Sequence, residues 1–151
     1  RVGRIGMIDA CGHPYTIPLR FVWSAQCLYV RVDHEGRKGE ALEKNNRVCF
    51  ETDVCAPDFS HYASVVVEGA LIDVCDPAEK RAALVAYNAK YTRLCGLPNP
   101  GPNPVIQGVA LRKLLVEKVT GRKREPDAPL VRRVPMALRG RGRGRTRATL
   151  R

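Results

Sequence analysis

The stretch LYVRVDHEGRKGEALEKNNRVCFE, residues 28–51, decides the fold because it sets two strand patterns around one short helix. A β-rich run at 27–32 leads to a turn marked by Gly36, and residues 40–44 suit a single helical span closed by two asparagines. A second β run follows at 47–53, with its apolar residues on one face. The helical span is too short for the crossover of a dinucleotide-binding fold.

Strand patterns continue on both sides of this stretch. Residues 4–8 and 15–23 are β-rich and flank turn-forming residues, which predicts a hairpin. Pro18 cannot donate a ladder hydrogen bond, so its strand is expected at an edge, bulged, or open to a ligand. Residues 62–74 form a long β run in which Gly69 permits a bend.

One clear helix interrupts the strands late in the chain. Asp76 suits the N-cap and Pro77 the first helical position, and residues 78–93 place Ala83, Leu84, Tyr87 and Tyr91 on one face. Residues 105–120 are expected to form a last strand, with a helix as the alternative. The sequence therefore predicts a mainly β protein, a six-stranded antiparallel barrel with one main helix and a short crossover helix.

The positive charge of the chain lies mostly at its C-terminal end. The net charge is +11 over 151 residues. Residues 122–151 hold 11 basic and two acidic side chains and therefore carry most of this charge. We expect a globular domain at 1–121 and a disordered Arg/Gly-rich tail at 122–151. Nucleic acid is an unlikely partner and would bind only through this tail, because no RNA-binding module accompanies it.

The six cysteines do not form a metal or redox motif. No CxxC pair is present, and Cys49 lies in an apolar run where a buried thiol is expected. We predict no metal site and six reduced cysteines. Because no signal peptide and no membrane-spanning apolar run is visible, we expect a cytoplasmic protein with no membrane partner.

The best candidate for chemistry is the sequence Gly36-Arg37-Lys38. Two adjacent cations follow a glycine at a strand-to-helix transition, where helix N-terminal amides favour an anion. A solvated basic pair is the simpler local interpretation. The sequence contains no GxSxG motif, no HExxH motif and no identifiable catalytic triad, so it does not support a hydrolase.

Three segments in order resemble one family. They are GRIGMIDACGHPYTIPLRFVW, LYVRVDHEGRKGEALEKNNRVCFE and YASVVVEGALIDVCDPAEKRAAL, and together they resemble the flavin-binding split-barrel superfamily. More narrowly, they resemble the pyridoxamine 5′-phosphate oxidase-like proteins of the nitroimidazole-resistance type. The resemblance implies a six-stranded split barrel that forms a homodimer and holds FMN at the subunit interface.

The resemblance also assigns residues to the cofactor. Arg37 and Lys38 match the cationic pair on the FMN phosphate, and the other matching positions lie along strands that face the flavin. Those positions are Thr16, Ile17, Pro18, Leu19, Val30, Arg31 and Ser64. Plain core or surface roles are the alternative for Ile17, Leu19, Val30 and Ser64.

Two departures from the family pattern bear on the chemistry. Arg31 stands where the nitroimidazole-resistance-like members often have a histidine, which weakens any chemistry assigned to that histidine. The C-terminal substrate-binding segment of true pyridoxamine phosphate oxidases is replaced by the Arg/Gly tail, so the vitamin B6 reaction is not expected. Deazaflavin F420 or haem is a less favoured cofactor than FMN.

The sequence thus predicts an FMN-dependent oxidoreductase that passes a hydride from a reduced nicotinamide through the flavin to an organic acceptor, which includes nitro compounds. The substrate is a small molecule, and no catalytic residue is assigned. The alternatives are a non-enzymatic split barrel that binds flavin, F420 or haem, and a protein that binds nucleic acid through its basic tail.

Overall fold

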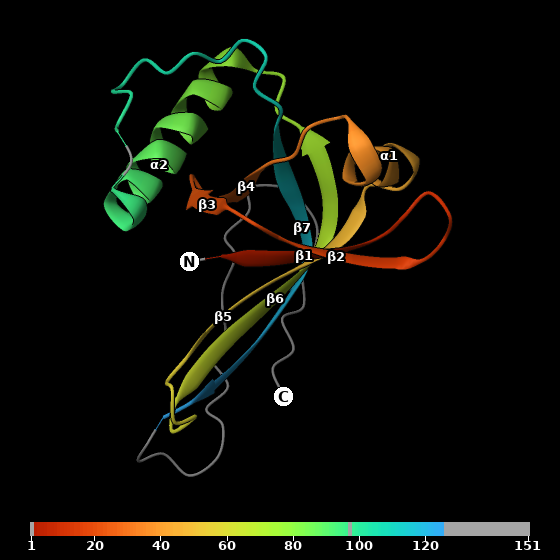
Figure 1. Cartoon of the computed structure of the whole chain (residues 1–151), viewed down its shortest axis with the longest axis vertical. Helices are drawn as coiled ribbons and strands as arrows, with labels where there is room; N and C mark the ends of the chain where they lie inside the picture. Colours follow the sequence, from red (N-terminus) through yellow and green to blue (C-terminus); the bar gives the residue numbers. More distant parts are fainter. Residues whose placement is uncertain (1, 97, 126–151) are drawn as a thin grey trace.

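The computed structural model describes residues 2–96 and 98–125. The disordered tail was predicted from residue 122, but residues 122–124 belong to the last strand, which continues past the expected domain end. The rest of the predicted tail, from residue 126 onward, lies outside the described residues. Within the described residues, seven strands and two helices follow one another (Figure 1). In chain order they are β1 (Gly3–Ile8), β2 (Pro14–Leu19), β3 (Phe21–Ser24), β4 (Cys27–Arg31), α1 (Gly36–Lys44), β5 (Arg47–Cys55), β6 (Tyr62–Asp73), α2 (Pro77–Cys95) and β7 (Leu111–Arg124).

The strands form one curved sheet in the order β2-β1-β5-β6-β7-β4-β3, and neighbouring strands are antiparallel. This confirms the mainly β split barrel. The expected count of six strands was wrong, because the run at 15–23 breaks at Arg20 into two strands. β2 pairs with β1, whereas β3 pairs with β4, so the chain passes from one edge of the sheet to the other.

The helices begin and end close to their predicted limits, with one exception. Asp76 caps α2 by accepting hydrogen bonds from the backbone N–H groups of Ala78 and Glu79 at 3.2 and 3.1 Å. The predicted stripe of Ala83, Leu84, Tyr87 and Tyr91 is the buried face of α2. α1, however, begins at Gly36 rather than at residue 40.

The last strand, β7, also differs from its predicted limits, because it begins at Leu111 and not at residue 105.

The predicted bend at Gly69 is present as a bulge. The register between β6 and β7 shifts between Glu68 and Gly69. A Cβ atom at Gly69 would lie 2.0 Å from the backbone oxygen of Leu115. Glycine is therefore required here by the close approach of the neighbouring backbone.

Two apolar clusters stabilise the domain. The larger lies inside the curved sheet and beneath α1, with Phe50, Ile5 and Val30 fully buried in it. The smaller lies beneath α2, where Tyr29 and Leu111 meet the helix stripe. Cys49 is exposed, so the expectation of a buried thiol was wrong, because Val48 and Phe50 turn inward and Cys49 between them turns outward.

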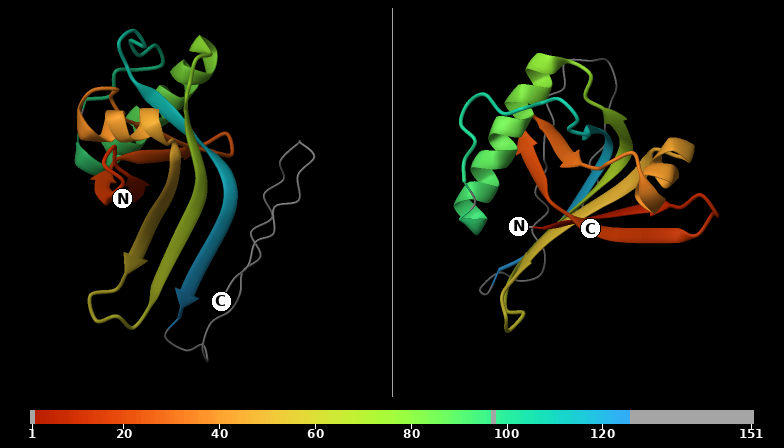
Figure 2. Two further views of the ribbon diagram at one scale, coloured as in Figure 1. Left: turned by 90° about the vertical axis from the view of Figure 1, so that its right-hand side faces the viewer. Right: turned by 45° about the horizontal axis from the view of Figure 1, so that its top comes forward.

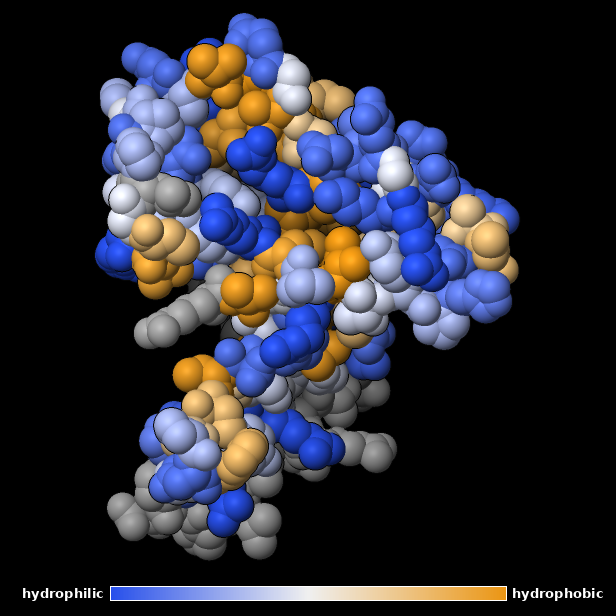
Figure 3. Space-filling model, in the orientation of Figure 1, coloured by the Kyte–Doolittle hydropathy of each residue, from blue (hydrophilic) through white to orange (hydrophobic). Residues whose placement is uncertain are grey.

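The outer halves of β5, β6 and β7 form an extension that we call the arm, residues 51–66 and 120–124. Both described helices lie at the opposite end of the molecule (Figures 1 and 2). Val54 on the arm and Phe59 at its tip are 67% and 73% exposed, and apolar side chains are visible on this part of the surface (Figure 3). Within one chain, the arm thus leaves apolar groups in solvent.

Among residues 2–96 and 98–125, neither helix combines the length and the apolar content needed to cross a membrane.

Candidate functional site

The first turn of α1 combines positive charge with backbone amides that no side chain caps. Glu35 occupies the N-cap position without a side-chain cap hydrogen bond, and the first turn holds no acidic residue. The amides of this turn therefore lack the side-chain acceptor that usually satisfies them. Arg37 and Lys38 lie in the same turn and add two positive charges to the positive end of the helix.

Two glycines shape this turn. Gly36 adopts a positive φ of 74°, which lets the chain enter the helix from the preceding loop. A Cβ atom at Gly39 would lie only 1.8 Å from the carbonyl oxygen of His34. The helix start is thus pressed directly against the loop backbone, and residue 39 has no room for a side chain.

Arg37 is held from two sides. Its Nη2 donates a hydrogen bond of 2.7 Å to Oδ2 of Asp9, and its Cζ lies 4.2 Å from the centre of the Tyr15 ring. Asp9 also accepts backbone hydrogen bonds from Cys11 and His13. The hydrogen bond from Arg37, followed by that from His13, lowers the pKa of Asp9 to about 2. Asp9 therefore stays ionised and keeps the guanidinium in place.

Lys38 is less tightly engaged. Its Nζ lies 4.0 Å from Oδ2 of Asp33, and both side chains are accessible to solvent. An ion pair of this length between accessible groups contributes little to stability. The ammonium group is therefore available to a ligand.

The predicted positions on β2 alternate across that strand. Thr16 and Pro18 are exposed, whereas Ile17 and Leu19 are half-buried against the large core cluster. β2 is an edge strand, as expected from Pro18. The stacking of Arg37 on Tyr15 places the start of α1 beside this strand. The structure therefore brings the predicted phosphate and ring segments together.

The other predicted positions are dispersed. The Val30 side chain is fully buried in the core, so only its backbone could face a ligand, while Arg31 is exposed. Ser64 lies on the arm, opposite Asp53 on β5 and Arg122 on β7. The tip of the arm and α1 are at opposite ends of the molecule (Figure 1). A single chain does not bring Ser64 to Arg37.

Asp9 and Tyr15 are the site residues that the sequence did not reveal. Asp9 belongs to recognisable turn chemistry, but nothing in the sequence pairs it with an arginine 28 residues later. Tyr15 reads as an ordinary strand residue, and its contact with Arg37 depends on the packing of α1 on the hairpin.

Comparisons with known proteins give a consistent result. The sequence pattern of a family described as pyridoxamine 5′-phosphate oxidase matches residues 1–123. No curated protein matches the chain.

Several solved structures are similar to this chain. One is a candidate 5-nitroimidazole antibiotic resistance protein from Bacteroides thetaiotaomicron, with 28% identity over 80% of this chain and 75% of that chain, and a TM-score of 0.62. Another is a FAD-binding protein from Mesorhizobium loti, with 26% identity over 82% and 86% of the two chains and a TM-score of 0.59. A haem-binding protein from Mycobacterium smegmatis shares the fold, with 16% identity over 81% and 48% and a TM-score of 0.58.

Proposed function

The chain belongs to the pyridoxamine 5′-phosphate oxidase family, and from this premise we propose that it is an oxidoreductase that uses bound FMN. The observation that carries the proposal is the start of α1. There, amides without a side-chain cap share the first turn with Arg37 and Lys38, and that turn holds no acidic residue. A phosphate group suits this donor set, because it accepts hydrogen bonds from amides and pairs with both cations.

The neighbouring strand supports the same assignment. Among the described residues β2 pairs only with β1, so the backbone groups along its other edge are open, and Arg37 stacks on Tyr15 of the same strand. A flavin ring laid along this edge would keep its phosphate chain next to Arg37. The Mesorhizobium loti relative, described as FAD-binding, makes a flavin the favoured ligand over haem or F420.

The proposal includes a homodimer. Ser64 is a predicted flavin contact, yet it lies on the arm, away from the start of α1 (Figure 1). A second copy whose arm reaches across would bring its own Ser64 to the site and would cover apolar groups such as Val54. Each cofactor site would then be made by two chains.

When bound, the flavin supplies the redox chemistry, namely hydride uptake from a reduced nicotinamide and electron transfer to a small organic acceptor, with nitro compounds among the candidates. The protein's own residues bind and orient the cofactor. Arg37 and Lys38 hold its phosphate, and the β2 backbone holds the ring. No acid or base of the chain is required for hydride transfer, in keeping with the absence of an assigned catalytic residue.

Titration of FMN against the full chain, followed by flavin fluorescence, tests the proposal. Wild-type protein should bind FMN, and Lys38→Ala should weaken binding about tenfold or more, as for a lost charge-assisted contact. Arg81→Ala provides the control, because Arg81 is an exposed cation on α2. Equal affinity in wild type and Lys38→Ala would reject the phosphate assignment, and absence of binding in wild type would reject the function.

A further inference from the structure

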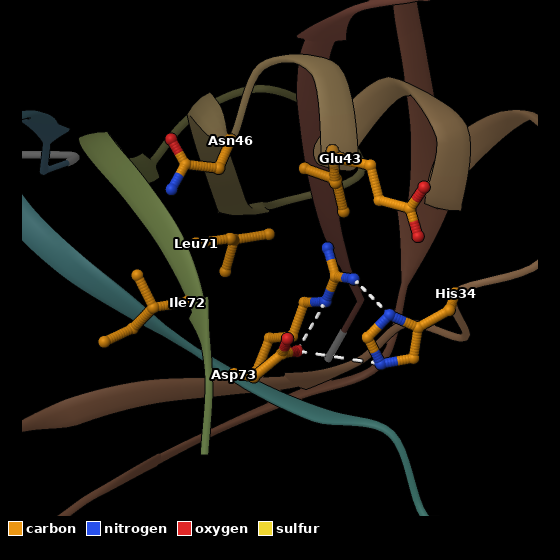
Figure 4. Close-up of a pocket in the computed structure, with 8 residues that line it drawn as sticks. His34, Glu43, Asn46, Leu71, Ile72 and Asp73 are labelled. Carbon is orange, nitrogen blue, oxygen red and sulfur yellow. Dashed lines mark hydrogen bonds and ion pairs between the residues drawn. The ribbon is translucent and has the colours of Figure 1, made fainter. Parts of the chain in front are cut away.

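A second candidate site lies on another side of α1. A pocket of about 390 Å³ opens between the C-terminal half of α1, the end of β6, the start of β7 and the loop after β4 (Figure 4). Leu42 and Leu71 supply its apolar side chains, whereas the Ile72 side chain points away on the other side of β6 (Figure 4). The backbone N–H of Leu71 donates a 2.8 Å hydrogen bond to the Asn46 carbonyl, which fixes the end of the helix against β6. The predicted flavin site faces β2 instead.

Arg112 is the central polar group of this pocket. Its side chain is only 5% exposed, although it carries a full positive charge. Nη2 contacts Nδ1 of His34 at 3.0 Å, and Nε lies 3.0 Å from Oδ1 of Asp73. That ion pair does not have hydrogen-bond geometry, since Nε is buried without a hydrogen-bond partner among the described residues. A buried guanidinium with so few of its five N–H donors satisfied favours an added acceptor.

The contact with Arg112 assigns a role to each ring nitrogen of His34. A guanidinium can only donate, so Nδ1 of His34 accepts and the ring carries its proton on Nε2. Nε2 lies 3.9 Å from the same Asp73 oxygen, and the dashed lines of Figure 4 mark these interactions.

We propose that this pocket binds a small monocarboxylate with an apolar or aromatic body. A planar carboxylate matches the guanidinium, and the side chains of Leu42 and Leu71 flank the space for the body of the ligand. Two acidic residues, Asp73 and Glu43, also line the pocket. They repel a doubly charged ligand more strongly than a singly charged one, so the pocket disfavours phosphate relative to a monocarboxylate. This site is independent of the proposed flavin function.

Isothermal titration calorimetry of the full chain with sodium benzoate tests the proposal, with inorganic phosphate as the contrasting anion. Benzoate should bind and phosphate should not. Asp73→Asn should tighten benzoate binding by roughly threefold to tenfold, because it removes a competing anion from a half-exposed position. Arg112→Gln should abolish binding, whereas Arg47→Gln, an exposed arginine paired with Glu117, should leave it unchanged.

The Asp73→Asn result keeps the test decisive even if Arg112→Gln fails to fold, because Asp73 is half-exposed and its replacement is nearly isosteric. A merely structural role for the cluster predicts no gain in affinity from this change. Absence of benzoate binding in both wild type and Asp73→Asn would overturn the proposal. Phosphate binding as tight as benzoate binding would overturn it as well.

Discussion

Arg37 and Asp9 form a 2.7 Å hydrogen-bonded ion pair between the first turn of α1 and the tip of the β1–β2 hairpin. The contact uses one terminal nitrogen of Arg37, while the guanidinium stacks on Tyr15. The plane of the guanidinium is thereby fixed before any ligand arrives. Asp9 is in this sense a positioning residue for the predicted phosphate contact.

Asp9→Asn should lower the free energy of unfolding at neutral pH. Asparagine preserves an acceptor for the Cys11 and His13 amides but loses the charge that pairs with Arg37. Because the folded-state pKa is depressed from 3.8 to about 2, the stabilisation is complete above about pH 4 and is lost as the pH falls through about 2. Urea unfolding of both proteins across this pH range measures the difference.

Glu51→Gln is the matched control for this experiment, because Glu51 pairs with Arg4 at an exposed position elsewhere in the sheet. Its effect should be small at every pH. A wild-type advantage over Asp9→Asn that persists undiminished near pH 2 would contradict the ionic explanation.

Gly39→Ala should destabilise the domain by roughly 1–3 kcal/mol, the usual cost of overpacking. Helix propensity alone predicts the opposite, because alanine favours a helix by about 1 kcal/mol over glycine. The clash with the His34 carbonyl oxygen, 1.8 Å from the added Cβ, decides the sign. Thermal unfolding followed by circular dichroism measures it.

Gly6→Ala serves as its control, since an added Cβ there meets neighbouring atoms no closer than 3.6 Å. The change at Gly6 should stay within about 0.5 kcal/mol of wild type. A stabilised Gly39→Ala protein would show that α1 does not pack on the loop as described.

Asp76→Ala should cost about 1 kcal/mol, because two amides at the start of α2 lose their acceptor. Asp76→Asn should retain most of the stability, since the asparagine side-chain oxygen caps nearly as well. Chemical denaturation of the three proteins provides the comparison. Equal losses in both variants would indicate that charge, rather than the cap hydrogen bonds, matters at this position.

Local signals in the sequence predicted much of the fold. The Asp76 cap and the 3.6-residue stripe of α2 depend on neighbours within a few turns, and both were confirmed. Gly69 was predicted to bend its strand and lies at the bulge. Pro18 was placed on an edge strand or an equivalent open position, and β2 is an edge. In each of these cases the cause is local, either the chemistry of the residue itself or the spacing of its near neighbours.

Features that depend on distant packing were not predictable in the same way. The break at Arg20 arises because β2 and β3 pair with strands at opposite edges of the sheet, which no local pattern specifies. The early start of α1 depends on Gly39 fitting against the His34 carbonyl, whereas glycine in sequence reads as a helix breaker. The Asp9–Arg37 pair joins two elements that only the folded sheet brings together.

Light scattering of the full chain should give a mass near twice 16.8 kDa, because the proposed site takes Ser64 from a second copy. Ser64→Trp should weaken FMN binding if the arm reaches the partner's site, while the protein stays folded, since Ser64 is accessible on the arm of a single chain. A monomer that binds FMN with full affinity would contradict the shared site.

The most direct test of the central claim is the near-ultraviolet and visible absorbance spectrum of the purified full chain, with the mass of any molecule that heat releases. The flavin account predicts a yellow protein with a flavin spectrum and released FMN, or a colourless protein that gains this spectrum when FMN is added. A protein that shows no flavin bands and takes up no added FMN would contradict it.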